Sequence, residues 1–283
     1  AAFSRLRHLR LAKDTAALWL LALLVVGFFW RILLGDAYGP AGGGDLASFL
    51  YPYYTYAAHS LHRGHVPFWN PYVFSGAPFV GDIQSGLFYP INLLQFLISP
   101  NLTYLDMEAL AILHIFIAGA STYACLRCLL GLQLGRGPAL VGAIGFMLVG
   151  LFIVHFGNLN MIAVAAWLPL VFVLFVRAVK HRSPLSAAWS GLILGLSALA
   201  GHIQPTLCNA LFLLLYAIWQ GVAVYTATRS PRQAVGPLLT FALTGATALV
   251  ISASATVPAL MVSGHTARAS FTYWEASQYS LSP

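Results

Sequence analysis

The sequence predicts an all-α polytopic bundle of about seven transmembrane helices. Hydrophobic residues make up 59% of the 283 residues and charged residues only 7%, whereas about 25% of a soluble domain is charged. The mean hydropathy is +0.80. Apolar runs close to the roughly 20 residues that cross a bilayer recur along the chain. The alternating pattern of a membrane β-barrel is absent from the sequence, so the class is all-α.

Seven apolar runs account for the predicted spans, each close to the length that crosses a bilayer at about 1.5 Å rise per residue. An eighth run, 91–98, is too short to cross and is expected to form an interfacial or re-entrant helix. It belongs to a long first loop, 35–104, within a single transmembrane domain over 1–283. In chain order the predicted spans are 16–34, 107–126, 138–154, 161–176, 185–200, 206–225 and 235–260.

Basic residues set the predicted orientation, because short cytoplasmic loops retain Lys and Arg. With the N-terminus in the cytoplasm, eleven of the fourteen basic residues fall on the cytoplasmic side. Six of the seven acidic residues fall outside or at the outer boundary, and Asp14 falls inside. Since both patterns agree, the net charge of +7 is a signal of topology and does not indicate nucleic-acid binding.

This orientation brings the unusual polar segments to one face. The first loop lies outside, together with the connections 155–160, 201–205 and 263–283. His, Asn, Gln and Asp gather in these segments, whereas the cytoplasmic connections are small and basic. Any one segment is explained as a polar helix end at a water interface. Their concentration on one face favours a site built from several loops on a helical scaffold.

Asp45 is the leading candidate for a catalytic residue. It follows the flexible run Pro40-Ala41-Gly42-Gly43-Gly44 and precedes an amphipathic segment, 46–61, that is rich in aromatic residues. A helix N-cap explains the same placement, and the two roles are compatible. Asp82 is the second carboxylate of the loop and suits a turn as well as a site. Together they are candidate ligands for a divalent cation, Mg²⁺ or Mn²⁺, although their spacing is not diagnostic.

Aromatic residues crowd the first loop, as in the interfacial belt of many membrane proteins. Such side chains also form surfaces that bind sugars or lipid headgroups. Trp69 and Asn70 stand between Pro67 and Pro71, and the prolines stiffen the backbone around them. This rigid presentation favours a binding wall at Trp69 and Asn70.

Several short sequence elements occur one after another along the chain. They are Asp45, Tyr51-Pro52, Gly64-His65-Val66-Pro67-Phe68-Trp69-Asn70-Pro71, Gly76-Ala77-Pro78, Phe88-Tyr89-Pro90 and Gly201-His202-Ile203-Gln204-Pro205. In this order they resemble the YfhO family of bacterial membrane proteins, which in turn resemble the GT-C class of glycosyltransferases. The resemblance spans almost the whole chain.

The resemblance implies a multi-pass enzyme of the bacterial cytoplasmic membrane. It would take a sugar from a polyprenyl-phosphate donor and transfer it, on the extracytoplasmic side, to an envelope glycan or lipid acceptor. In that class an acidic residue of the first outer loop is the catalytic carboxylate, and Asp45 is the matching position. Because GT-C enzymes have more spans than this chain, we expect the sequence to be an N-terminal portion of a longer protein.

The transfer chemistry gives roles to the other outer residues. A well-placed carboxylate that takes the proton of the acceptor hydroxyl contributes about 10²- to 10⁴-fold to the rate. The departing lipid phosphate needs cationic or hydrogen-bonding partners. The candidates are Arg63, His65, His202, His265 and Arg268 for the phosphate, and Trp69, Asn70, Asp82 and Gln204 as further substrate-binding residues.

Motifs of other enzyme classes are absent from the sequence: H-E-x-x-H, G-x-S-x-G, a Walker loop and the Rossmann glycine pattern. Two other functions remain open. A transporter or flippase of lipid-linked saccharides is disfavoured because His114 is the one ionisable residue well inside a predicted span. An acyltransferase would use an outer His such as His155 or His202.

Overall fold

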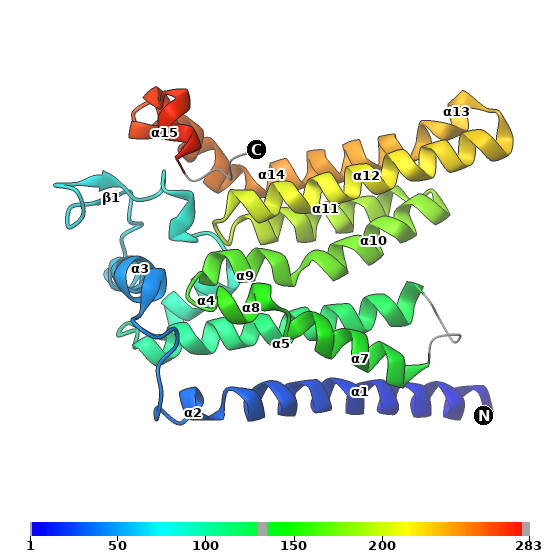
Figure 1. The fold of residues 1–283 in the computed structure, drawn as a ribbon, viewed down its shortest axis with the longest axis horizontal. Coiled ribbons are helices and arrows are strands. Elements are labelled where there is room, and N and C mark those ends of the chain that lie inside the picture. The colour runs from blue at the N-terminus through cyan, green and yellow to red at the C-terminus, as the bar shows by residue number, and fades with distance from the viewer. Residues whose placement is uncertain (1, 130–134, 279–283) are drawn as a thin grey trace.

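The fold is that of a computed structural model, which describes residues 2–129 and 135–278. Within these residues the regular secondary structure is helical apart from one two-stranded hairpin. Figure 1 shows long helices lying side by side, with their connections gathered at two opposite ends. The prediction of an all-α helical bundle is confirmed.

Short elements separate the first helices from α5, and the long apolar helices follow. η1 is a π-helix, and η2 and η3 are 3₁₀ turns. The elements in chain order are α1 (Ala2–Phe28), α2 (Trp30–Leu33), η1 (Leu46–Leu50), α3 (Tyr51–His62), β1 (Trp69–Asn70), β2 (Ala77–Pro78), η2 (Ile83–Ser85), α4 (Pro90–Ile98), α5 (Tyr104–Leu129), α7 (Arg136–Met147), α8 (Gly150–Val154), α9 (Leu159–Ala166), α10 (Leu168–His181), α11 (Pro184–Ala198), α12 (Ile203–Thr228), α13 (Pro231–Ala234), α14 (Gly236–Ser263), η3 (Ala267–Ser270) and α15 (Tyr273–Ser277).

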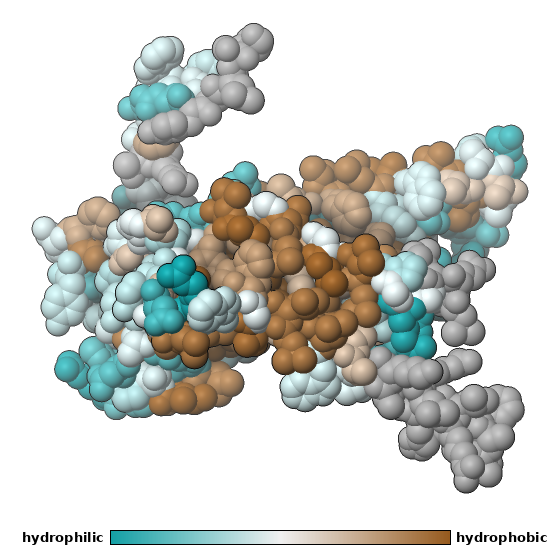
Figure 2. Space-filling model, turned by 60° about the horizontal axis from the view of Figure 1, so that its bottom comes forward, coloured by the Kyte–Doolittle hydropathy of each residue, from teal (hydrophilic) through white to brown (hydrophobic). Residues whose placement is uncertain are grey.

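Among the described residues, five helical stretches are long and apolar enough to cross a membrane, which makes this a candidate multi-pass membrane protein. Two further apolar helices, Asp14–Phe28 and Pro184–Ala198, are shorter. Figure 2 shows the matching surface, on which an apolar band covers the middle of the bundle and more polar groups lie toward its ends. The five long stretches are Tyr104–Leu129, Arg136–Val154, Leu159–His181, Ile203–Thr228 and Pro231–Ser263.

Two of the predicted spans are interrupted. The run 138–154 breaks between α7 and α8, where Val149 is extended (ψ 153°). The run 161–176 breaks at Trp167, between α9 and α10, because Pro169 in the first turn of α10 cannot donate the backbone hydrogen bond that would continue the helix. Both breaks lie near the α8–α9 connection and shape the segment that carries the candidate site.

The apolar helix α11 is packed between α10 and α14. Gly191 and Gly195 bring its backbone close to α14, since a Cβ atom on Gly195 would lie 2.7 Å from the carbonyl oxygen of Ala248. Small residues four apart allow this approach in membrane bundles, where van der Waals contact drives helix association. The glycine pair therefore fixes how α11 and α14 pack.

Charged residues separate between the two ends. We call the end with the N-terminus and α13 the basic end, and the end with α2, α3, the hairpin and α15 the loop end (Figure 1). Asp14 belongs to the basic end, where its Oδ1 accepts from Tyr123 (2.7 Å) and Arg136 (2.8 Å). The side chains of Arg5, Arg7, Arg10 and Lys13 lie outside the described part. The described basic residues of the basic end are Arg127, Arg136, Arg177, Lys180, Arg182, Arg229 and Arg232.

Candidate functional site

The segment that leads to Asp45 is held between α5 and the α8–α9 connection. The backbone N–H of Gly39 donates to Glu108 Oε1 at 2.6 Å. On the other side, Pro40 lies so close to Gly157 that a Cβ atom there would be 2.8 Å from Pro40 Cγ. These two contacts bring the following residues, and with them Asp45, to the α8–α9 connection.

The Asp45 carboxylate is hydrogen-bonded to Asn158. Asp45 occupies the N-cap position of η1, but its side chain makes no capping hydrogen bond, so the capping interpretation is wrong. Asn158 Nδ2 instead donates to Asp45 Oδ2 at 2.6 Å, and His155 Nδ1 lies 3.3 Å from Asn158 Oδ1. The amide oxygen accepts, so His155 donates from Nδ1 and its Nε2 is left for another partner. Asp45 itself is exposed, and Asn158 orients it while leaving it open to a ligand.

His202, which precedes α12, lies close to His155. Its side chain is half-buried, and its Nδ1 atom has no hydrogen-bond partner in the described structure. Burial lowers the pKa of His202, and nearby His155 lowers it further, because two positive charges at one place repel. The 155–158 connection therefore meets Asp45 through Asn158 and lies near His202 through His155, although the three segments are far apart in the sequence.

Asp82 has a structural role. Its Oδ1 accepts the backbone N–H of Gln84 at 2.9 Å and so caps η2, which confirms the predicted turn. Burial raises the pKa of Asp82, and the Gln84 N–H and the Tyr53 hydroxyl lower it. Burial of Tyr53 itself, together with the Asp82 charge, raises the pKa of Tyr53 to about 12.

A buried polar network lies beneath this turn. The Tyr54 hydroxyl donates to Asn160 Oδ1 (3.0 Å) and accepts from Asn92 Nδ2 (2.7 Å), while Asn160 Nδ2 donates to the Gln84 carbonyl (2.7 Å). The turn also lies against Gly201, where a Cβ atom would collide with the Ile83 carbonyl oxygen. The network thereby joins α3, α4, α9 and η2 into one platform.

The other predicted binding residues are placed separately. Asn70 is buried, and its Oδ1 accepts the backbone N–H of Tyr72 at 3.0 Å, as a turn residue does. Trp69 is 54% exposed on the β1–β2 hairpin. The described contacts connect none of these residues to Asp45, and the Arg268 side chain lies outside the described part. Arg63, His65, His265 and Gln204 are exposed at the loop end.

A hollow of about 470 Å³ adjoins the glycine run before Asp45, a size within the usual range of small-molecule sites. Its wall includes Gly42 and Gly43, which offer bare backbone to a ligand, and the rings of Tyr38 and Tyr104. The two rings meet edge to face with their centres 6.0 Å apart. The hollow therefore offers aromatic and backbone contacts beside the segment that precedes Asp45.

Sequence reasoning missed two residues of this region. Glu108 is fully buried, and its Oε2 atom has no hydrogen-bond partner in the described structure. Its position near the start of an apolar helix was the available signal, because ionisable residues in such helices usually serve a function. Asn158 belongs to a polar connection that the sequence did single out, but nothing in the sequence linked it to Asp45.

The predicted divalent cation has no cluster of protein ligands in the described residues. No three His, Cys, Asp or Glu side chains there are grouped as a metal site requires.

Comparison of the chain with protein-family models, curated proteins and solved structures finds no match. The resemblance to the YfhO family stays a prediction from the sequence.

Proposed function

We propose that this chain forms the outer-face site of a membrane glycosyltransferase, which moves a sugar from a polyprenyl-phosphate donor to an envelope glycan or lipid. One observation carries the proposal: the 2.6 Å hydrogen bond from Asn158 to Asp45. It orients an exposed carboxylate of the first loop at the connection that carries His155, and the glycine run before Asp45 lines a hollow of about 470 Å³.

The proposed topology has seven spans, the five long stretches together with α1 and α11. The basic end faces the cytoplasm of a bacterial cell, since Lys and Arg are retained on that side. The loop 35–104, with its short helices, then lies outside. α11 is about 22 Å long at 1.5 Å per residue, shorter than the roughly 30 Å hydrocarbon core, and its glycine contacts with α14 hold it within the bundle.

In the proposed reaction the acceptor hydroxyl gives its proton to Asp45 Oδ1, the oxygen that Asn158 leaves free. The acceptor oxygen forms a bond to the anomeric carbon as the bond from that carbon to the phosphate oxygen breaks. The electron pair of that bond leaves with the polyprenyl phosphate. His202, whose Nδ1 atom has no hydrogen-bond partner in the described structure, can donate a hydrogen bond to the departing phosphate.

A second function, movement of a lipid-linked saccharide across the bilayer, is favoured by Glu108. This carboxylate is fully buried in α5, a candidate span, with one oxygen lacking a partner in the described structure. Intramembrane carboxylates often mark transport paths. His114, also fully buried in α5, is instead satisfied by Tyr89 and the Leu110 carbonyl.

Sugar transfer in membranes that contain the protein tests the proposal. Radiolabelled polyprenyl-phosphate sugars are supplied, and wild type is compared at matched expression with Asp45→Asn and with Asp36→Asn, an exposed carboxylate of the same loop. We expect Asp45→Asn to lose about 10²- to 10⁴-fold of the rate and Asp36→Asn to keep it. Transfer unaffected by Asp45→Asn would refute the assignment, and labelled lipid that crosses the bilayer without transfer would establish the second function.

A further inference from the structure

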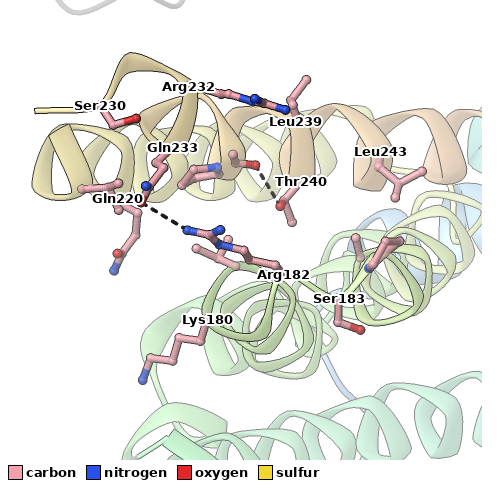
Figure 3. Close-up of a pocket in the computed structure, with 16 residues that line it drawn as sticks. Lys180, Arg182, Ser183, Gln220, Ser230, Arg232, Gln233, Leu239, Thr240 and Leu243 are labelled. Carbon is pink, nitrogen blue, oxygen red and sulfur yellow. Dashed lines mark hydrogen bonds between the residues drawn. The ribbon is translucent and has the colours of Figure 1, made fainter. Parts of the chain in front are cut away.

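A second cavity lies at the opposite end from the proposed site. It holds about 800 Å³ and opens between the end of α10, the start of α11 and the pair α12 and α14 (Figure 3). Its lining includes the cations Lys180, Arg182 and Arg232, and none of the described lining residues is acidic. The cavity thus carries positive charge that no carboxylate in its wall balances.

Arg182 is the cation best placed to meet a ligand. Figure 3 shows its guanidinium directed into the space between α10 and α13, whereas Lys180 points away from that space. The described structure gives the guanidinium one long hydrogen bond, 3.5 Å to Gln233 Oε1. A planar guanidinium has five N–H donors and binds phosphate oxygens in pairs, so most of its donors are left for a ligand.

The backbone at Arg182 strengthens this assignment. Arg182 ends α10 in the left-handed conformation (φ 49°), a position that glycine occupies most readily. A bulky residue in that conformation is strained and points to a role for its side chain. Arg229 ends α12 in the same conformation (φ 55°) but does not line the cavity.

The other walls of the cavity suit a lipid better than a free ion. Ser230 and Gln220 add polar groups near the mouth, while Leu239 and Leu243 of α14 provide an apolar side. Leu239 is 64% exposed and lies along the face that a bilayer would cover. A headgroup phosphate at Arg182 would therefore continue into acyl chains along α14.

We propose that this cavity binds the phosphate of an anionic phospholipid on the inner leaflet, with Arg182 as its main contact. Basic pockets between transmembrane helices on the cytoplasmic side are suited to such headgroups. The site is independent of Asp45 and of sugar transfer, and its placement on the inner leaflet rests on the proposed topology.

Lipid binding by the full chain in detergent micelles tests this proposal. Fluorescent phosphatidylglycerol and phosphatidylcholine are titrated against wild type, Arg182→Gly and the matched control Arg229→Gly. Both variants remove one arginine from a left-handed position, so both are expected to fold, and thermal unfolding checks this. We expect Arg182→Gly to weaken phosphatidylglycerol binding about fivefold, the usual effect of one cation near an anionic leaflet, with phosphatidylcholine binding and Arg229→Gly unchanged.

Three results would overturn the proposal. Equal losses in the two variants would indicate a general surface charge effect, and no loss in Arg182→Gly would remove the site. If millimolar inorganic phosphate displaces phosphatidylglycerol and the protein binds phosphate and phosphatidylglycerol with equal affinity, free phosphate is the ligand instead of a lipid.

Discussion

Asn158 Nδ2 lies 2.6 Å from Asp45 Oδ2, although 113 positions separate the two residues in the sequence. This hydrogen bond fixes the carboxylate that the sequence singled out, and it does so from the connection between α8 and α9. The amide oxygen of the same Asn158 side chain lies 3.3 Å from His155 Nδ1. Asn158 therefore organises a carboxylate and a histidine at once, and its removal gives the first prediction.

Asn158→Ala is expected to slow sugar transfer about tenfold or more. A hydrogen bond to a charged group contributes about 1.5–3 kcal/mol, and each 1.4 kcal/mol corresponds to tenfold. The rate constant kcat in membranes is the measurement, with the exposed Asn101→Ala at the same end as control. Equal rates for Asn158→Ala and wild type would show that Asp45 needs no such partner.

Asp82→Ala is expected to lower stability by about 1 kcal/mol, the usual cost of losing a cap, while the transfer rate stays near that of wild type. The reason is that Asp82 caps η2 through Gln84. Thermal unfolding in detergent and the transfer assay measure the two effects. A large loss of transfer with unchanged unfolding would instead place Asp82 in the substrate site.

Asn160→Ala is expected to be among the most destabilising single changes at the loop end. It leaves the Tyr54 hydroxyl and the Gln84 carbonyl without their partner, and each buried unpaired group costs about 1–3 kcal/mol. A double-mutant cycle with Tyr54→Phe, followed by thermal unfolding, separates the two contributions. Additive effects of the two changes would mean that Tyr54 and Asn160 do not interact.

Gly195→Ala is expected to destabilise the protein by about 1–3 kcal/mol through overpacking. The added Cβ would lie 2.7 Å from the Ala248 carbonyl oxygen, whereas a Cβ on Gly145 of α7 meets nothing within 4 Å. The same substitution at Gly145 is the control and should be neutral or stabilising by up to about 1 kcal/mol. Matching unfolding temperatures for the two variants would contradict close packing of α11 on α14.

Stability is expected to fall as the pH drops below about 6.5, in part because of His202. Its folded pKa lies below the ordinary value of 6.5, so the unfolded chain binds the proton first, and protonation favours unfolding. The contribution of neutral His202 to the free energy of unfolding is complete above pH 6.5 and is lost as the pH falls through the folded pKa. Unfolding midpoints between pH 7.5 and 5 measure it. His202→Asn should flatten this slope and exposed His181→Asn should not; an unchanged slope in His202→Asn would assign it to other groups.

The sequence alone determined the membrane class and most helix positions. The short run 91–98 is helical, as α4 (Pro90–Ile98), and the run 206–225 lies within α12 (Ile203–Thr228). Both follow from the local length and composition of apolar segments, which depend little on distant residues. The separation of charge between the two ends was also predictable, because it follows from which connections between the apolar runs carry Lys and Arg. Asp82 also followed from local chemistry, because a turn cap needs only its neighbours.

Only the tertiary structure decided which polar residues meet. The partner of Asp45 depends on how Gly39 and Pro40 pack against α5 and Gly157, and no local pattern records that packing. The placement of Arg182 likewise depends on the space left between α10 and α13. Hydrophobic length determines where helices form, whereas contacts between distant segments depend on side-chain fit across the whole bundle, which a single sequence does not display.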